Sequence, residues 1–392
     1  MKKIAVMIVV FLFYKNQEEL YMMNFKDFCN QVEKNISNYL PPRYQGAQVR
    51  IQKNRKVNLG DLAGVSVTMP GQPVGPVIYL NNYYRDVAKG NMTMSQVFEG
   101  IAREGAESLD RIKGSEIGGL DPSMLGVWSA MKDRVYLSAV GLTRNKGLLA
   151  TVPHREMGDI ACTYRIHLKG PDGSDGTILV NNQMMDTFHV NEEQIFQAAV
   201  ENTLKNTPPT LNRMSVVTSC MMMQQSGHRE ETKERLLDNN LLDVDTLKKG
   251  EPEEQNQSSR DEETRSEGHD QISLDDDLPL FVLTTSAMTL GAAVVFVPNV
   301  LEQIQQKMPE GFFVLPSSIH EVMIVPRKLG SDPRQLDEMI SDINETQVDP
   351  EDQLSDLCHE YDADRKMLIC PTAPELNKVK DEEPELVPGV SL

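Results

Sequence analysis

The sequence predicts an α+β fold, in which two tandem repeats of antiparallel strands plus helix precede a C-terminal αβ region. Apolar positions alternate between the period of a strand and that of an amphipathic helix, with turn-rich segments between them. A pattern of about forty residues occurs twice, which indicates an internal duplication. The chain has 392 residues, 40% hydrophobic and 25% charged, an ordinary globular composition with room for more than one core.

The first 22 residues resemble a targeting signal, since two lysines precede an apolar run over 4–14. No small-residue cleavage site follows, and the run is too short to cross a bilayer. The codons for 17–19 can spell a ribosome-binding site, so we expect translation to start at Met22 or Met23. The alternative is a short membrane-interacting segment, and we expect no membrane association unless residues 1–22 are translated.

Residues 23–115 are expected to form an N-terminal helix and the first repeat. The apolar spacing from 24 to 40 predicts a helix, which the two prolines at 41 and 42 end. The remaining elements of this region are predicted as strands over 47–52, 62–69 and 77–80 and a long helix over 94–112.

Residues 116–223 are expected to form the second repeat. The parallels in chain order are 61–63 with 159–161, 77–82 with 177–182, Asp86 with Asp186, and 96–98 with 194–196. Order, chemistry and spacing agree, which favours a duplicated hairpin-plus-helix unit. Each copy carries an Asn-Asn pair before its helical segment, and we expect Asn82 and Asn182 to take equivalent helix-capping positions.

Residues 224–277 are predicted to be an acidic disordered insertion, with at most one short helix around their leucines. Residues 371–392 are predicted to be a disordered tail. Between them, residues 278–370 are expected to form the C-terminal αβ region. Its predicted strands are 281–285, 292–297, 312–315 and 322–325, and its predicted helices are 298–308, 333–344 and 350–361.

Charge and cysteine usage limit the function classes. The formal net charge of −19 repels nucleic-acid phosphates, and the densest basic stretch, 50–56, is predicted as strand and turn. Nucleic-acid binding is therefore not expected. Five cysteines without C-x-x-C spacing are typical of a reducing compartment, so we expect a cytoplasmic protein. Neither a P-loop nor a dinucleotide-binding glycine motif occurs, and we expect no cofactor.

Several motifs carry a resemblance to a known family. They are Val152-Pro153-His154-Arg155 with 159–161, 193–196 with 201–203, and Leu315-Pro316-Ser317-Ser318-Ile319-His320-Glu321-Val322. With these the chain resembles an uncharacterised family of low-GC Gram-positive gut bacteria, a domain of unknown function of the DUF5688 type. The resemblance covers roughly 23–370 apart from the acidic insertion. It implies a start near Met22 or Met23, but no reaction and no site residues.

Ser317, Ser318, His320 and Glu321 form the tightest set of residue types suited to nucleophilic or acid–base catalysis. A hydrolase would also need an orienting acid and an oxyanion hole from elsewhere in the chain. The alternative is a polar turn whose hydroxyls and imidazole bind backbone groups.

No metal site is expected, because the seven histidines show no H-x-x-x-H spacing. A zinc site assembled across the fold from His154, His189 and His320 stays open as an alternative. His359 and Glu360 are adjacent in a predicted helix, where neighbouring side chains diverge.

Together these features favour a non-catalytic intracellular binding or accessory protein, carried on mobile elements. A duplicated unit offers a groove for a protein or peptide, which we expect as the partner, and the acidic stretch offers an interaction segment. The alternative is a hydrolase that uses the Ser317 to Glu321 segment.

Overall fold

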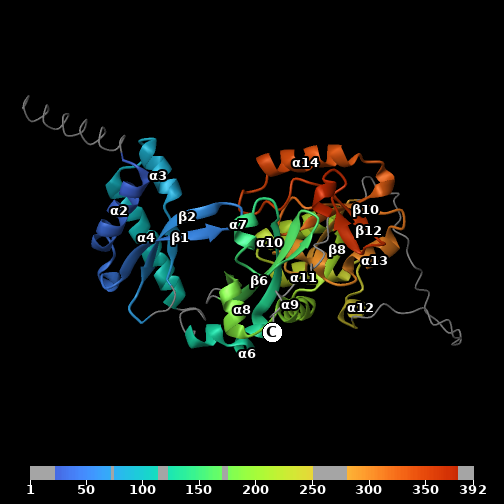
Figure 1. Cartoon of the computed structure of the whole chain (residues 1–392), viewed down its shortest axis with the longest axis horizontal. Helices are drawn as coiled ribbons and strands as arrows, with labels where there is room; N and C mark the ends of the chain where they lie inside the picture. The colour runs from blue at the N-terminus through green and yellow to red at the C-terminus, as the bar shows by residue number, and fades with distance from the viewer. Residues whose placement is uncertain (1–22, 72–74, 114–121, 170–174, 250–279, 378–392) are drawn as a thin grey trace, which may run out of the picture. The chain divides into compact units, whose positions relative to one another are not determined.

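The computed structural model describes residues 23–71, 75–113, 122–169, 175–249 and 280–377 (Figure 1). They form two compact units. The first comprises the described residues up to Val135 with Ala150–Val152 and Arg165–Asn191, and the second comprises Tyr136–Leu149, Pro153–Tyr164 and the described residues from Glu192 onward. The expectation for residues 1–22 lies outside the described residues.

The first unit begins with a helix and a three-stranded antiparallel sheet of order β1-β2-β3. The ranges are α2 Phe25–Asn35, η1 Ile36–Asn38, η2 Pro42–Tyr44, β1 Gln48–Lys56, β2 Gly60–Thr68, β3 Val77–Tyr79, α3 Asn81–Ala88 and α4 Met94–Lys113. Asn24 caps α2 by accepting the N–H of Asp27 at 2.9 Å. The helices and strands predicted for 23–115 are therefore confirmed.

The core of this part of the first unit lies between the sheet and the apolar faces of α2 and α4 (Figure 1). Fully buried side chains come from both helices and from β2, among them Phe28, Val32, Val65, Val67 and Ile101. Each of these burials stabilises the unit by roughly 1.5–3 kcal/mol, and the short helix α2 would not persist without such packing.

The rest of the first unit includes η3 Pro122–Gly126, α6 Trp128–Met131, η4 Lys132–Arg134, β7 Asp175–Leu179 and α8 Asn182–Phe188. Strand β6, Ile160–Lys169, passes from the second unit into the first. Its later residues pair antiparallel with β7, with Arg165 opposite Leu179. Its earlier residues pair with β5, Arg155–Met157, in the second unit.

The second unit is built on a six-stranded antiparallel sheet of order β13-β12-β10-β11-β9-β8. The strands are β8 Pro209–Arg213, β9 Phe281–Thr285, β10 Phe312–Leu315, β11 Val322–Pro326, β12 His359–Asp362 and β13 Met367–Ile369. The other elements are β4 Val135–Gly141 (from Tyr136 on), α7 Lys146–Leu149, α9 Glu192–Asn206, α10 Met214–Gln225, α11 Arg229–Asp238, α12 Val244–Lys249, η5 Gly291–Phe296, α13 Val300–Lys307, η6 Arg327–Leu329, α14 Pro333–Thr346 and η7 Pro374–Asn377.

Side chains on one face of this sheet pack against α10, α11 and α14. Val282 packs with Val217, Cys220 and Leu236 from the first two helices. Phe313, Leu315 and Val325 pack with Leu336 and Ile340 from α14. Asp332 starts α14 by accepting the N–H of Arg334 at 3.0 Å, with a proline at the first helical position. Helices and antiparallel sheets in one chain confirm the α+β class.

Two predicted elements of the C-terminal region are wrong. Residues 292–297 form the 3-10 helix η5 rather than a strand. All of its side chains are buried, and a short apolar run cannot distinguish a buried strand from a buried helical turn. Residues 350–361 form turns and then β12 rather than a helix, because Leu354 and Ser355 donate their N–H groups to the carbonyls of Ser317 and Pro316.

The predicted disorder of 224–277 is wrong for residues 224–249, where α11 and α12 lie. Leu236, Leu242 and Leu247 are buried there. The stretch therefore has enough apolar side chains to pack, although its overall composition is acidic. Residues 250–277 lie outside the described residues. The predicted disorder of 371–392 is wrong for residues 371–377, where Asn377 exchanges two hydrogen bonds with the backbone of Cys370. Residues 378–392 lie outside the described residues.

The two proposed repeats share one element order, strand, strand, short helix and long helix, as β2-β3-α3-α4 and β6-β7-α8-α9. That the two stretches superpose stays a prediction. The capping expectation is wrong in detail: Asn181, not Asn182, accepts the N–H of Met184 at 2.9 Å and caps α8. In the first stretch α3 starts after Leu80 without a side-chain cap.

Candidate functional site

The Ser317 to Glu321 segment joins β10 to β11 and is held by residues 352–355. Ser318 forms an isolated β-bridge with Gln353, and Ile319 donates its N–H to the carbonyl of Asp352 at 2.8 Å. The Ser317 carbonyl accepts the N–H of Leu354 at 3.2 Å. Backbone contacts alone therefore hold the segment against residues 352–355.

The ring of His320 is engaged at both nitrogens. Its Nδ1 accepts the backbone N–H of Leu290 at 3.2 Å, and its Nε2 lies 3.5 Å from a carboxylate oxygen of Asp352. An accepting Nδ1 places the proton of the neutral ring on Nε2, where it faces Asp352. Neither partner could be predicted from sequence, because both are distant from His320 along the chain.

The serines do not reach that ring. The Ser318 hydroxyl is buried and accepts the backbone N–H of His320 itself at 3.0 Å, as in a local serine turn. Ser317 is partly exposed. Burial raises the pKa of the Glu321 carboxyl, while His320 and Ser318 oppose that shift. The four predicted residues therefore lie together, but a serine–histidine hydrogen bond, which nucleophilic catalysis needs, is not formed.

His320 instead holds the loop between β9 and η5. Its carbonyl accepts the N–H of Gly291 at 2.9 Å and the hydroxyl of Thr284 at 2.8 Å. Met288 and Leu290 in this loop have φ of 54° and 52°, the left-handed region that side chains rarely occupy. Such conformations persist only where neighbours over-determine them, and they concentrate at functional sites.

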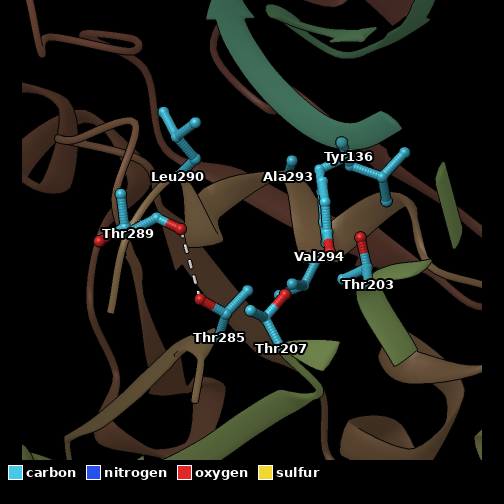
Figure 2. A pocket seen from close by; sticks show the side chains of 9 residues that line it. Tyr136, Thr203, Thr207, Thr285, Thr289, Leu290, Ala293 and Val294 are labelled. Atoms are coloured by element: carbon cyan, nitrogen blue, oxygen red, sulfur yellow. Dashed lines mark hydrogen bonds between the residues drawn. The ribbon is translucent and has the colours of Figure 1, made fainter. Parts of the chain in front are cut away.

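One hollow beside this loop, the threonine hollow, has a volume of about 20 Å³, room for one water molecule. Figure 2 shows side chains from α9, β9 and η5 converging on it, with the Thr285 hydroxyl donating to the Thr289 carbonyl at 3.3 Å. The Thr203 hydroxyl is buried without a hydrogen-bond partner among the described residues. With room for one water molecule, this hollow fits a hydration site better than a substrate site.

A second hollow, the α11 hollow, has a volume of about 160 Å³. Its wall includes residues of the loop between β9 and η5, residues from the end of α10 and residues of α11. The lining residues are Gln224, Arg229, Glu230, Thr232, Lys233, Ser286, Ala287 and Met288. Sequence reasoning missed this hollow because it had assigned residues 224–249 to disorder.

Arg155, from the Val-Pro-His-Arg motif, forms the densest ion-pair network in the described part of the second unit. Its guanidinium binds Glu192 at 2.8 Å, also binds Glu193, and stacks 3.6 Å from the ring centroid of Phe196. Tyr164 donates its hydroxyl to Glu192. Burial lowers the pKa of Arg155, but its bonds to the two glutamates outweigh that and raise it. These contacts tie β5 to α9.

Asp159, from the same motif region, is buried and fully bonded. Its carboxylate accepts the hydroxyls of Thr143 at 2.7 Å and Ser355 at 2.9 Å. Its N–H donates to Nε2 of His359 at 3.0 Å. These partners connect β12 to the start of β6. The contacts of Asp159 therefore give this part of the motif a structural role.

Across the described ranges, no group of three or more histidine, cysteine or acidic side chains could hold a metal ion. Of the three histidines considered for zinc, His189 belongs to the first unit and His154 and His320 belong to the second. His154 lies 3.3 Å from Glu156. Within the same ranges, no helix is both long and apolar enough to cross a membrane.

Comparison with known proteins gives one relationship. A family model described as a family of unknown function, DUF5688, matches residues 25–363. No significant match was found among curated proteins or among solved structures. The match spans most of the chain, from α2 to the residue after β12, and includes all the motifs described above. The chain therefore belongs to the family of unknown function DUF5688.

Proposed function

We propose that the protein is a non-catalytic binding or accessory protein rather than a hydrolase. The observation that carries the proposal is the hydrogen bond from the Leu290 N–H to Nδ1 of His320, at 3.2 Å. A general base must take a proton from its nucleophile with the nitrogen that faces it. In His320 one nitrogen is occupied by a backbone donor and the other faces Asp352, so the ring braces the loop.

A hydrolase is the second candidate, because the His320 and Asp352 pair resembles the histidine and acid of a catalytic triad. For that role the ring would have to release Leu290 and turn toward Ser317 or Ser318. Releasing it would leave the N–H of a left-handed residue without its acceptor, which costs about 1–3 kcal/mol. The binding function requires no such rearrangement.

The proposed compartment is the cytoplasm, and the proposed partner class includes a protein or peptide. All five cysteines are free and buried, which suits a reducing compartment. The net charge of −19 disfavours nucleic acid as a partner.

A fluorophosphonate probe, which labels activated serines covalently, tests the proposal. We expect intact-mass analysis of the full chain to find no adduct on Ser317 or Ser318. In parallel, His320→Gln should lower the free energy of unfolding by about 0.5–2 kcal/mol, because the Leu290 N–H loses its acceptor. Stoichiometric labelling that disappears in a fully stable His320→Gln variant would establish the hydrolase instead.

A further inference from the structure

The loop between β9 and η5 is held to the rest of the second unit at both ends and through the ring of His320. At its start the N–H of Ser286 donates to the carbonyl of Pro208 at 2.9 Å, and directly after it Gly291 donates to the His320 carbonyl at 2.9 Å. Between these points Leu290 donates its N–H to Nδ1 of His320 at 3.2 Å. No second acceptor for the Leu290 N–H lies among the residues that the structure describes.

The backbone of this loop is strained where the ring holds it. Met288 and Leu290 have φ of 54° and 52°, and neither residue is a glycine. A residue with a side chain leaves the left-handed region unless its surroundings keep it there. The hydrogen bond from Leu290 to His320 is therefore a contact whose loss allows the loop to relax.

This hydrogen bond depends on the protonation state of the imidazole. Nδ1 can accept the Leu290 N–H only in the neutral ring, because both nitrogens of the charged ring carry a hydrogen. In the charged ring the N–H groups of Nδ1 and Leu290 would point at each other. The His320 side chain is 33% exposed, so protons reach it from solvent. Histidine is the side chain that commonly changes charge between pH 5 and 8.

Two acidic side chains face the ring. The Asp352 carboxylate lies 3.5 Å from Nε2, and Glu321, the next residue in the chain, interacts electrostatically with the ring. The loop between β9 and η5 itself, residues 286–290, has no titratable side chain. Asp352 faces the nitrogen that does not bind the loop, so it would hold the charged ring in place after Nδ1 has given up the Leu290 N–H.

We propose that His320 is a pH-sensitive latch on the loop between β9 and η5. The neutral ring holds Leu290 in its left-handed conformation, and the ring releases it on taking up a proton from solvent. A proton binds the released form more tightly than the latched form, so acid shifts the population toward release. Thr289 and Leu290 line the threonine hollow (Figure 2), which release opens to solvent. The inference deepens the bracing role of His320 on which the proposed function rests.

Amide hydrogen exchange of the full chain at about pH 8 and about pH 5, corrected for the pH dependence of the chemical exchange rate, tests the latch. The matched variant is His320→Asn, whose amide oxygen lies near the position of Nδ1 and accepts the Leu290 N–H at either pH. We expect protection of peptides that cover Leu290 to fall about tenfold more on acidification in the wild type than in this variant. The other histidines titrate alike in both chains, so their effects cancel.

Three further variants separate the latch from a structural role. His320→Leu offers no acceptor and should leave the Leu290 amide poorly protected at both pH values. Glu321→Gln should keep the response to acid, whereas Asp352→Asn should move it to lower pH, because the charged ring loses its counter-ion. An equal response in the wild type and His320→Asn, or loss of the response in Glu321→Gln, would overturn the latch. Serine labelling reads a different property, so failure of the latch and failure of the proposed function are distinguishable.

Discussion

His359, at the start of β12, has no exposed surface, and Gly158 with φ of 60° lies directly against its ring. A side chain at 158 would put its Cβ 2.4 Å from Cδ2 of the imidazole. The second ring nitrogen, Nδ1, makes no well-formed hydrogen bond within the described chain. Burial lowers the pKa of His359 to about 4, with the Leu357 carbonyl and Asp337 opposing that shift. The ring is held neutral by its surroundings.

This histidine should make stability depend on pH. Unfolded, it takes up a proton near its ordinary pKa of 6.5, whereas folded it does so only near 4. The unfolded state therefore binds more protons between these values, and the contribution, about 3 kcal/mol, is present above pH 6.5 and is lost as pH falls toward 4.

Urea unfolding across that pH range checks the prediction. His359→Gln should be less stable than the wild type at pH 7.5 but should lose less stability on acidification. Parallel pH profiles for the two chains would contradict the prediction.

The four predicted site residues show how much of a site can be predicted from sequence at the scale of single residues. Proximity in the chain correctly placed Ser317, Ser318, His320 and Glu321 in one turn. It could not show that His320 binds Leu290 and Asp352, because those contacts bridge 30 and 32 residues and depend on how β9, β10 and β11 pair. Those contacts decide whether the His320 ring is free for catalysis or holds the loop between β9 and η5.

At the scale of elements, α8 offers a matched test of capping. Asn181 accepts the N–H of Met184, whereas Asn182, the first residue of the helix, is exposed and does not cap it. We expect Asn181→Ala to lower the free energy of unfolding by about 1 kcal/mol, because an orphan helix N–H loses its acceptor. Asn182→Ala should cost only a few tenths of a kcal/mol, within the usual range of exposed substitutions.

Denaturant unfolding of both variants provides the measurement. A larger loss for Asn182→Ala would mean that the helix begins one residue later than the structure places it.

Elements with a clear periodic pattern were predictable from sequence. The helix from Met94 and the strands of the first unit follow from apolar spacing that one buried face requires. The failures lie where distant backbone groups decide the conformation. Asp349 and Pro350 form a good helix-start signal, yet the following residues pair with the β10–β11 turn. Acidic composition likewise concealed the three buried leucines after residue 235.

At the scale of the whole molecule, the five cysteines have a common state. Each is buried and free, and burial is the largest cause that raises the pKa of each thiol; Cys370, for example, is raised to about 12. Because the thiolate is the reactive form, native cysteines of this kind should be inert.

Ellman's reagent at pH 8 should therefore modify less than about one thiol per folded chain within minutes. After unfolding in guanidinium chloride it should modify all five. Rapid reaction of one thiol in the folded chain would identify an exposed cysteine and contradict the uniform burial.

The division of the chain into two units has a consequence for how the protein is made. The chain passes between the units five times, after Val135, Leu149, Val152, Tyr164 and Asn191. During synthesis the first unit is incomplete until Asn191 has left the ribosome, by which time 26 residues of the second, Tyr136–Leu149 and Pro153–Tyr164, have already emerged. Cutting the gene at any one of these points divides at least one unit between the two fragments. A genetic dissection would need circular permutation or paired fragments rather than simple truncation.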